Sequence, residues 1–198
     1  MSAALRIIRS EHRSIEAVLH ALGFFVDRIW AGNPAPDPRV FHALLQYIDL
    51  FAEQLHHPKE DRHLFSRLRQ RTHEADALLD IAAEDHVRGA DRMRVLDQAF
   101  LRYEEGGITH FLGFAQAADT YAKAYRAHLD LEEMKIFPIA EGVLTAQDWR
   151  ELDAVFDGRG DPLVSPQTAR EMAKLFNHIV NIAPAPIGVA AELVEAPH

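Results

Sequence analysis

Apolar residues recur along positions 3 to 30 at alternating steps of three and four residues. This spacing places them on one face of an α-helix, so the segment is predicted to be an amphipathic helix. The positions on this face are Leu5, Ile8, His12, Ile15, Leu19 and Leu22. Gly32 and the prolines at positions 34, 36 and 38 then interrupt the pattern and predict a loop.

A second helix is predicted from about residue 39 to residue 70. The residues on the face of this helix that is predicted to point to the core, its stripe, are Leu45, Ile48, Ala52, His56 and Glu60. Pro58 lies inside this segment, and a proline within a helix removes one backbone donor and crowds the preceding turn. The sequence therefore predicts a kink or a lost backbone hydrogen bond beside His56 and His57.

The third predicted helix begins at Thr72, a residue suited to capping, and runs to about Glu105, where two glycines end it. Its stripe consists of Leu79, Ala82, His86, Gly89, Met93, Leu96 and Phe100. The fourth helix is predicted from about residue 108 to residue 137 and is expected to stop before Pro138. Its stripe contains Phe114, Ala117, Tyr121, Tyr125, His128 and Glu132.

These four long amphipathic segments have short connections, so the chain is predicted to be all-α, with residues 1–143 forming an up-down-up-down four-helix bundle. Two shorter helices are predicted to follow within residues 144–183. Thr145 and Asp148 begin one that ends near residue 157, and Ser165 with Pro166 begins the other. This extension is expected to pack on the bundle or on a partner subunit, and residues 184–198 are expected to form an extended tail.

Composition excludes several kinds of chemistry. The 198 residues contain no cysteine, which removes disulfides, thiolate zinc sites, iron–sulfur clusters and cysteine nucleophiles. The formal net charge of -9 disfavours binding to nucleic acid. Hydrophobic residues make up 48% and charged residues 26%, but no apolar run reaches the length of a membrane span. The N-terminus lacks the pattern of a secretory signal, so a cytoplasmic protein is expected.

Histidine is abundant, with 12 residues, and four histidines fall in the apolar stripes of four different helices. These are His12, His56, His86 and His128. His56 and His128 are each followed four residues later by a glutamate, Glu60 or Glu132. A single one of these histidines would be an ordinary hydrogen-bonded core residue, but four histidines and two carboxylates that face one bundle axis need a shared partner. A pair of iron, manganese or zinc ions in the bundle would satisfy all six groups.

The same residues carry a resemblance to a known family. The stretches EHRSIEAVL, LHHPKEDRHLF, EDH and HLDLEEMKIFP resemble the hemerythrin-like family of HHE cation-binding domains over about residues 5 to 140. The resemblance implies a non-haem di-iron centre with histidine and bridging carboxylate ligands that interacts with dioxygen. Carried over position by position, it implies the metal ligands His12, His56, Glu60, His86, His128 and Glu132.

The chain also departs from the oxygen-carrying members that it resembles. Those members have five histidine ligands, with a pair four residues apart on the third helix, whereas Ala82 and Ala90 stand at the corresponding positions around His86. One fewer histidine implies an open coordination position for water, substrate or another carboxylate. Glu16, four residues after His12, is either that carboxylate or a solvated acid on the first helix.

The last carboxylate ligand is also open to two assignments. The oxygen carriers have an Asp five residues after the histidine of the fourth helix, and here the fourth and fifth residues after His128 are Glu132 and Glu133. Glu132 is preferred because it lies nearer the His128 face, and Glu133 remains the alternative. His57 is rotated by roughly 100 degrees from His56 and is expected to point away from the metals. No role is assigned to His20, His42, His63, His73, His110, His178 or His198.

Three classes of function are consistent with these residues. The preferred expectation is a protein that holds two iron ions and binds dioxygen, senses it, or handles iron and oxygen. The second is a di-iron enzyme that detoxifies peroxide or nitric oxide, and the third is a helix bundle that a metal merely stabilises. Zinc and manganese are the expected substitutes for iron. The expected partner is dioxygen or another small diatomic or peroxide ligand, without nucleic acid or membrane, and a homodimer remains open.

Overall fold

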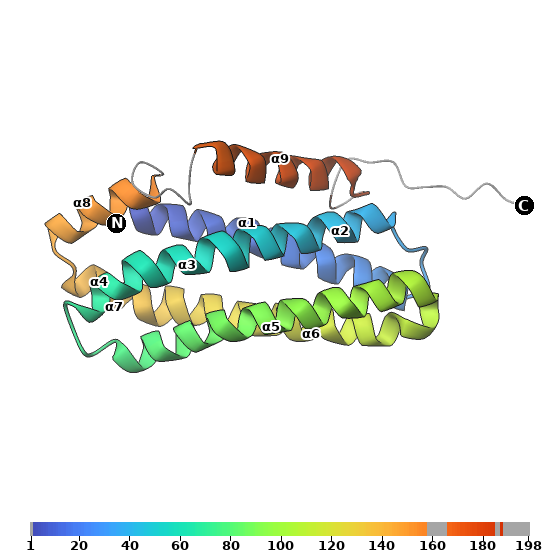
Figure 1. The fold of residues 1–198 in the computed structure, drawn as a ribbon, viewed down its shortest axis with the longest axis horizontal. Helices are drawn as coiled ribbons and strands as arrows, with labels where there is room; N and C mark the ends of the chain where they lie inside the picture. The colour runs from blue at the N-terminus through green and yellow to red at the C-terminus, as the bar shows by residue number, and fades with distance from the viewer. Residues whose placement is uncertain (1, 158–165, 185–186, 188–198) are drawn as a thin grey trace, which may run out of the picture.

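The computed structural model describes residues 2–157, 166–184 and 187, and the regular elements within them are helices, which confirms the predicted all-α class. Four long helical segments lie side by side along the long axis of the molecule (Figure 1). The first segment is α1 (Ala3–Trp30) and the third is α5 (Asp76–Gly106). The second contains α2 (Pro38–Tyr47), η1 (Ile48–His56), α3 (His57–Lys59), η2 (Glu60–Phe65) and α4 (Ser66–Arg69). The fourth contains η3 (Gly107–His110), α6 (Phe111–Leu131), η4 (Glu132–Ile136) and α7 (Phe137–Val143).

The second and fourth segments continue through their prolines because π-helical turns precede them. The N–H of His57 bonds to the carbonyl of Ala52, and the N–H of Phe137 bonds to the carbonyl of Glu132. Each bond reaches five residues back, which is the π-helical pattern, and a proline without an N–H comes next in both cases. The prediction that the fourth helix stops before Pro138 is therefore wrong, since α7 extends it to Val143. The disturbance expected at Pro58 takes the form of the π-helical segments η1 and η2.

The predicted cap of the third helix is also wrong, whereas its end is confirmed. The first turn of α5 begins at Asp76 after Ala75, and the Thr72 hydroxyl accepts a hydrogen bond from the backbone of Glu74 in the preceding loop. At the other end α5 stops at Gly106, and Gly107 has a φ of +65°. That backbone conformation is strained for a residue with a side chain, so a glycine suits this position.

The apolar core of the bundle is divided into two clusters by a buried polar layer. One cluster contains Ile15, Leu19, Ile48, Ala52, Met93 and Tyr125 among others. The second contains Leu5, Ile8, Leu64, Leu79, Ala82 and Ile136 among others. On α1, His12 lies between residues of the two clusters, and on α5 His86 does so. The predicted ligand positions therefore form a layer across the bundle between two buried apolar clusters.

Two further helices cover the bundle. The predicted capping box is confirmed, because Thr145 and Asp148 bond reciprocally at the start of α8 (Ala146–Phe156). Leu152 and Phe156 of α8 join the second apolar cluster, and Asp153 accepts a 2.7 Å hydrogen bond from the backbone of Ala4. The last helix, α9 (Pro166–Ile182), lies against α2 (Figure 1) and contributes Ile179 to the first cluster. Most of the predicted tail, residues 185–186 and 188–198, lies outside the described residues.

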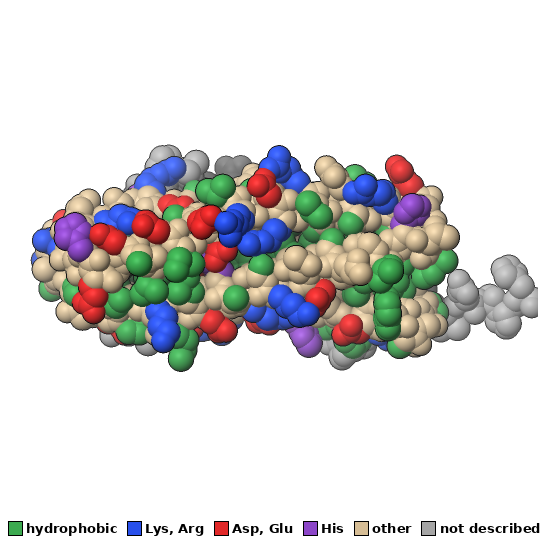
Figure 2. Space-filling model, turned by 90° about the horizontal axis from the view of Figure 1, so that it is seen from below, with side chains coloured by type: hydrophobic (Ala, Val, Ile, Leu, Met, Phe, Trp, Pro, Cys, Tyr) green, Lys and Arg blue, Asp and Glu red, His purple; other side chains and the backbone are tan. Residues whose placement is uncertain are grey.

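Charged side chains of both signs are interspersed on the surface. On the face drawn in Figure 2, lysines and arginines lie next to aspartates and glutamates over the long segments. Among the exposed ion pairs of the structure are Arg88 with Glu84 on α5 and Lys123 with Asp119 on α6. Among the described residues, none of the helices combines the length and apolar character that crossing a membrane requires.

Replacement of Asp148 by Asn should lower the melting temperature by several degrees at pH 7. The buried Asp148 carboxylate accepts hydrogen bonds from Arg71, Arg67 and Thr145, and Arg71 first among them holds its pKa well below the ordinary value. A carboxyl with a lowered pKa stabilises the fold above its unfolded pKa of about 4, and this contribution is lost as the pH falls below that value.

The difference in unfolding free energy between the wild type and this variant should therefore be largest at neutral pH. Urea unfolding at pH 7, 4 and 3 measures it, and the difference should shrink at the two acidic values. Asp119→Asn, which removes an exposed partner of Lys123, is the matched control and should change stability little. A difference that stays constant down to pH 3 would contradict the assigned role of the Asp148 charge.

Candidate metal centre

The six predicted ligands come together from four helical segments. His12 lies on α1, His86 on α5 and His128 near the end of α6. The remaining three lie in π-helical segments, with His56 ending η1, Glu60 starting η2 and Glu132 starting η4. All six side chains are buried, and both glutamates are 0% exposed. A carboxylate at zero exposure requires a compensating positive charge or several hydrogen bonds.

The six side chains form two overlapping groups of possible ligand atoms. His12, His56, Glu60 and Glu132 make one group, and His86, His128, Glu60 and Glu132 make the other. Within each group, one nitrogen or oxygen atom from every residue lies within 4.8 Å of all the others. Both carboxylates belong to both groups, so the arrangement has the form of two sites that share Glu60 and Glu132.

Distances between the donor atoms match the spacing of ligands around a common ion. His12 Nε2 lies 3.3 Å from Glu132 Oε2, and His56 Nε2 lies 3.3 Å from Glu60 Oε2. In the other group, His128 Nε2 lies 3.5 Å from Glu132 Oε1. Two ligands that are each about 2.1 Å from one ion and at roughly right angles are about 3 Å apart. The two oxygens of Glu132 thus face different groups, as a bridging carboxylate requires.

Unsatisfied polar atoms test whether a cation fits here. In the described part of the chain, every buried side-chain nitrogen or oxygen that lacks a hydrogen-bond partner belongs to this layer. They belong to His12, His56, His57, Glu60, His86, Tyr125, His128 and Glu132. A buried polar atom left without a partner costs about 1–3 kcal/mol. The donor set consists of imidazole nitrogens and carboxylate oxygens, and one or more cations would satisfy it.

Three carboxylates outside the two groups hold the opposite nitrogens of the imidazoles, and we call them the outer carboxylates. Glu133 lies 2.8 Å from His12 Nδ1, Glu11 lies 2.9 Å from His56 Nδ1, and Asp61 lies 3.0 Å from His86 Nδ1. Metal-binding histidines commonly donate their second N–H to such a carboxylate, which fixes the tautomer and the ring orientation. The outer carboxylates therefore aim Nε2 of each ring at the centre of the layer.

Sequence reasoning missed Glu11 and Asp61 and weighed Glu133 only as a ligand. Each outer carboxylate is the immediate sequence neighbour of a predicted ligand, but it contacts an imidazole of a different helix. An acidic residue directly beside a predicted ligand is therefore the sequence feature that could have identified these carboxylates. The geometry favours Glu132 over Glu133 at the centre, because Glu132 is buried among the imidazoles whereas the Glu133 side chain is 36% exposed.

Glu11 also connects the layer to the C-terminal part of the structure. Its second oxygen accepts a 2.7 Å hydrogen bond from Nζ of Lys59, which is itself buried. The Lys59 ammonium lies 4.9 Å from the ring centroid of Phe156 on α8, within the range of a cation–π contact. A continuous chain of contacts thus runs from α8 through Lys59 and Glu11 to His56.

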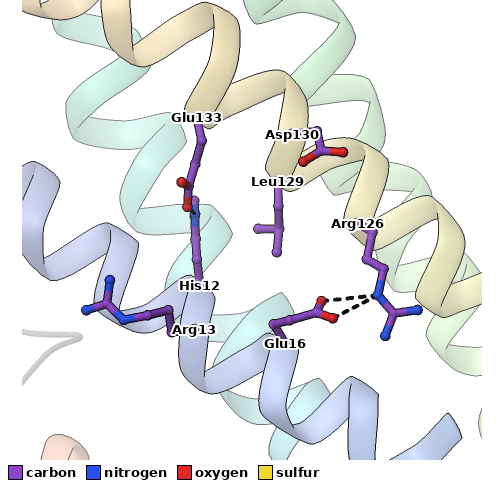
Figure 3. A pocket seen from close by; sticks show the side chains of 7 residues that line it. All are labelled: His12, Arg13, Glu16, Arg126, Leu129, Asp130 and Glu133. Atoms are coloured by element: carbon purple, nitrogen blue, oxygen red, sulfur yellow. Dashed lines mark hydrogen bonds and ion pairs between the residues drawn. The ribbon is translucent and has the colours of Figure 1, made fainter.

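Glu16 does not join the centre. It forms an ion pair with Arg126 of α6, at 2.9 Å, across a surface pocket of about 350 Å³. Figure 3 shows this pair at one side of the pocket, with Leu129 pointing into it and the His12 ring facing Glu133 at the other side. His12 therefore lies between the buried layer and an opening to solvent.

The expectation that His57 points away from the centre is wrong. His57 is only 3% exposed, its ring stacks on His86 with centroids 4.2 Å apart, and it forms a compact donor group with His86 and His128. The second segment contacts both α1 and α5. Two successive residues about 100 degrees apart on that segment therefore both face the interior, His56 toward α1 and His57 toward α5.

Burial keeps part of the cluster neutral. It lowers the pKa of His57 well below the ordinary value, and the nearby charge of His86 lowers it further. Burial also lowers the pKa of His128, to about 3. Both imidazoles are then in the neutral form that binds metals. Burial lowers the pKa of His12 as well, but the surrounding carboxylates, Glu132 first, outweigh it, so the pKa lies well above the ordinary value.

The fold and this layer define a helical-bundle protein with buried histidine and glutamate groups that could hold metal cations. The chain matches the family model of the hemerythrin HHE cation binding domain over residues 3–140, and it belongs to that family. The resemblance stated from the sequence is thereby confirmed. No curated protein and no solved structure matches the chain.

Removal of an outer carboxylate should weaken metal binding without unfolding the protein. Glu133→Ala leaves His12 Nδ1 without its carboxylate, and the loss of such a partner typically weakens metal affinity by about 10–100-fold. Competition with a chromophoric chelator measures the affinity. Glu104→Ala is the matched control, because Glu104 also contacts a histidine, His42, at 2.9 Å but far outside the layer. Equal affinities of the two variants would contradict the assigned role of Glu133.

Proposed function

We propose that this protein is a non-haem di-iron protein that interacts with dioxygen, in a bundle with up-down-up-down connectivity. The observation that carries the proposal is the concentration of unpartnered buried donors in one layer, arranged as two groups that share both carboxylates. Membership of the cation-binding family supports the metal, and the donor chemistry of imidazole and carboxylate suits iron, with zinc or manganese as substitutes.

The ligands divide into two pairs of imidazoles around the shared carboxylates. His12 and His56 would hold one ion, His86 and His128 would hold the other, and Glu60 with Glu132 would bridge them. Two iron ions held in this way supply the one- and two-electron chemistry that binding or reducing oxygen-derived molecules requires. Because all the ligand side chains are buried, they would bind as a set only in the folded protein.

The surroundings of the layer favour a small, weakly polar partner. Aromatic rings stack on the imidazoles, with Phe137 at 5.8 Å from His12 and Phe65 at 5.6 Å from His86. These rings and the two apolar clusters surround the layer with apolar side chains, which would suit a small ligand such as dioxygen. The pocket beside His12, between α1 and α6, opens to solvent next to the layer (Figure 3). Leu129 supplies an apolar side chain in this pocket, whose other lining side chains besides His12 are charged.

Turnover of peroxide or nitric oxide is the second candidate, and Tyr125 favours it. The Tyr125 hydroxyl is buried without a partner, and its ring lies 5.3 Å from that of His57. Burial, followed by the negative charges around it, raises its pKa well above the ordinary value, so the hydroxyl keeps its proton. A protonated hydroxyl beside the centre could donate a hydrogen bond to a small substrate.

Metal analysis tests the first part of the proposal. The purified, iron-loaded protein should contain two metal ions per chain, and chelation should lower its melting temperature because metal binds only to the folded state. Glu132→Ala, which removes a carboxylate shared by both groups, should reduce occupancy of both ions. Equal melting curves with and without metal would contradict the proposal.

The optical spectrum tests the interaction with oxygen. Reduced, iron-loaded protein should change its visible spectrum when exposed to oxygen, and zinc-loaded protein is the control that should not. Recovery of the starting spectrum under argon would support reversible binding. Permanent oxidation that Tyr125→Phe slows would support the enzyme instead, and an unchanged spectrum would leave only a metal that stabilises the fold.

A further inference from the structure

We propose that His57 is a metal ligand of this centre, the third imidazole around the ion held by His86 and His128, and that Glu53 positions it. This inference rests on the two-metal function proposed above and adds to it one ligand and one positioning residue. It makes the two halves of the centre unequal, with two imidazoles on one side and three on the other.

The position of His57 is the first argument. The residue offers a donor atom within 4.8 Å of donor atoms of both His86 and His128, and its ring stacks on His86 at a centroid distance of 4.2 Å. His86 Nε2 and His128 Nε2 themselves lie 3.1 Å apart. Three imidazoles therefore present nitrogen atoms to one small volume, which is the arrangement of ligands around a single ion.

The lack of a hydrogen bond to either ring nitrogen is the second argument. Both ring nitrogens of His57 are buried and neither makes a hydrogen bond. A histidine kept for packing alone would usually satisfy at least one nitrogen with a backbone or side-chain group. An apolar ring would fill the space between His86 and Tyr125 without this penalty. A metal ion accounts for the imidazole at this position.

Glu53 supplies the third argument. Its carboxylate lies 3.3 Å from His57 Nδ1, four residues back along the same segment, and its side chain is only 4% exposed. The buried Tyr121 hydroxyl donates a hydrogen bond to Glu53 and fixes the carboxylate. Glu53 thus contacts Nδ1 of His57 in the way that each outer carboxylate contacts Nδ1 of its own histidine. The opposite nitrogen, Nε2 of His57, is left to bind the ion.

Gly89 of α5 leaves the space that the Glu53 carboxylate occupies. A glycine in the interior of a helix is destabilising relative to alanine, so Gly89 in the middle of α5 needs a structural reason. A Cβ atom at this position would lie 2.6 Å from Glu53 Oε2. The missing side chain therefore leaves the space in which the Glu53 carboxylate lies beside His57.

Metal titration of variants tests the inference. His57→Phe keeps a ring between its neighbours and removes both nitrogens, and His57→Ala is the second variant in case the larger ring disturbs packing. The matched control is His73→Ala, because the His73 side chain is 93% exposed and lies outside the layer. Each protein is titrated with cobalt(II), whose visible spectrum reports the number and kind of ligands, in competition with a chelator.

Both His57 variants should keep one ion at nearly wild-type affinity and bind the second at least about 100-fold more weakly, with an altered cobalt spectrum. Glu53→Gln and Gly89→Ala should weaken the same ion by about 10–100-fold, because they disturb a positioning residue and leave the ligand in place. A merely structural role would lower the melting temperature of the metal-free protein and leave affinity and spectrum unchanged.

Two ions bound by both His57 variants with wild-type affinity and spectrum would overturn the inference. Fewer than two ions in the wild type would contradict the proposed function instead. The inference would then be decided by whether affinity and spectrum of the remaining ion differ between the wild type and His57→Phe.

Discussion

Two fully buried carboxylates in a layer between two apolar clusters impose the constraint on which this structure depends. An unpaired carboxylate in such a place is strongly unfavourable, so Glu60 and Glu132 require positive charge close by. Four helical segments each present an imidazole nitrogen to the shared carboxylates. The outer carboxylates then hold the far side of the rings. Part of this imidazole set is neutral, so the layer is short of positive charge and a bound cation would balance it.

The same constraint accounts for the irregular helices. Donor atoms must converge on points a few ångströms apart, and a regular helix offers only fixed directions for its side chains. The π-helical segments η1, η2 and η4 contain His56, Glu60 and Glu132, and π-helical turns are frequent at functional sites. They also allow the second and fourth segments to continue past Pro58 and Pro138. The π-helical turns therefore place the shared carboxylates Glu60 and Glu132 at the centre of the bundle.

The sequence predicts the helices and most of the layer because the apolar residues and the histidines recur at the same steps of three and four residues. His12, His86 and His128 occupy positions at which an apolar residue would otherwise face the core, so the stripe that predicts the helix also predicts the cluster. The spacing of apolar residues does not report whether a backbone N–H bonds four or five residues back. For this reason the sequence wrongly predicts that the helix ends at Pro138. Glu11 and Asp61 act on imidazoles of other helices, and their role is set by packing between segments. The position of His57 was predicted wrongly because one helix was assumed to have one narrow buried face.

The contact chain from Phe156 through Lys59 and Glu11 to His56 has a thermodynamic consequence. Glu11 contacts His56 of the centre directly and Phe156 of α8 through Lys59. Docking of α8 and binding of a metal would therefore each change the free energy of the other. Such coupling is reciprocal: if docking of α8 strengthens metal binding by some factor, metal binding favours docking by the same factor. A partner that pulled α8 from the bundle would act as an allosteric effector of the centre, and the loaded centre would resist that partner.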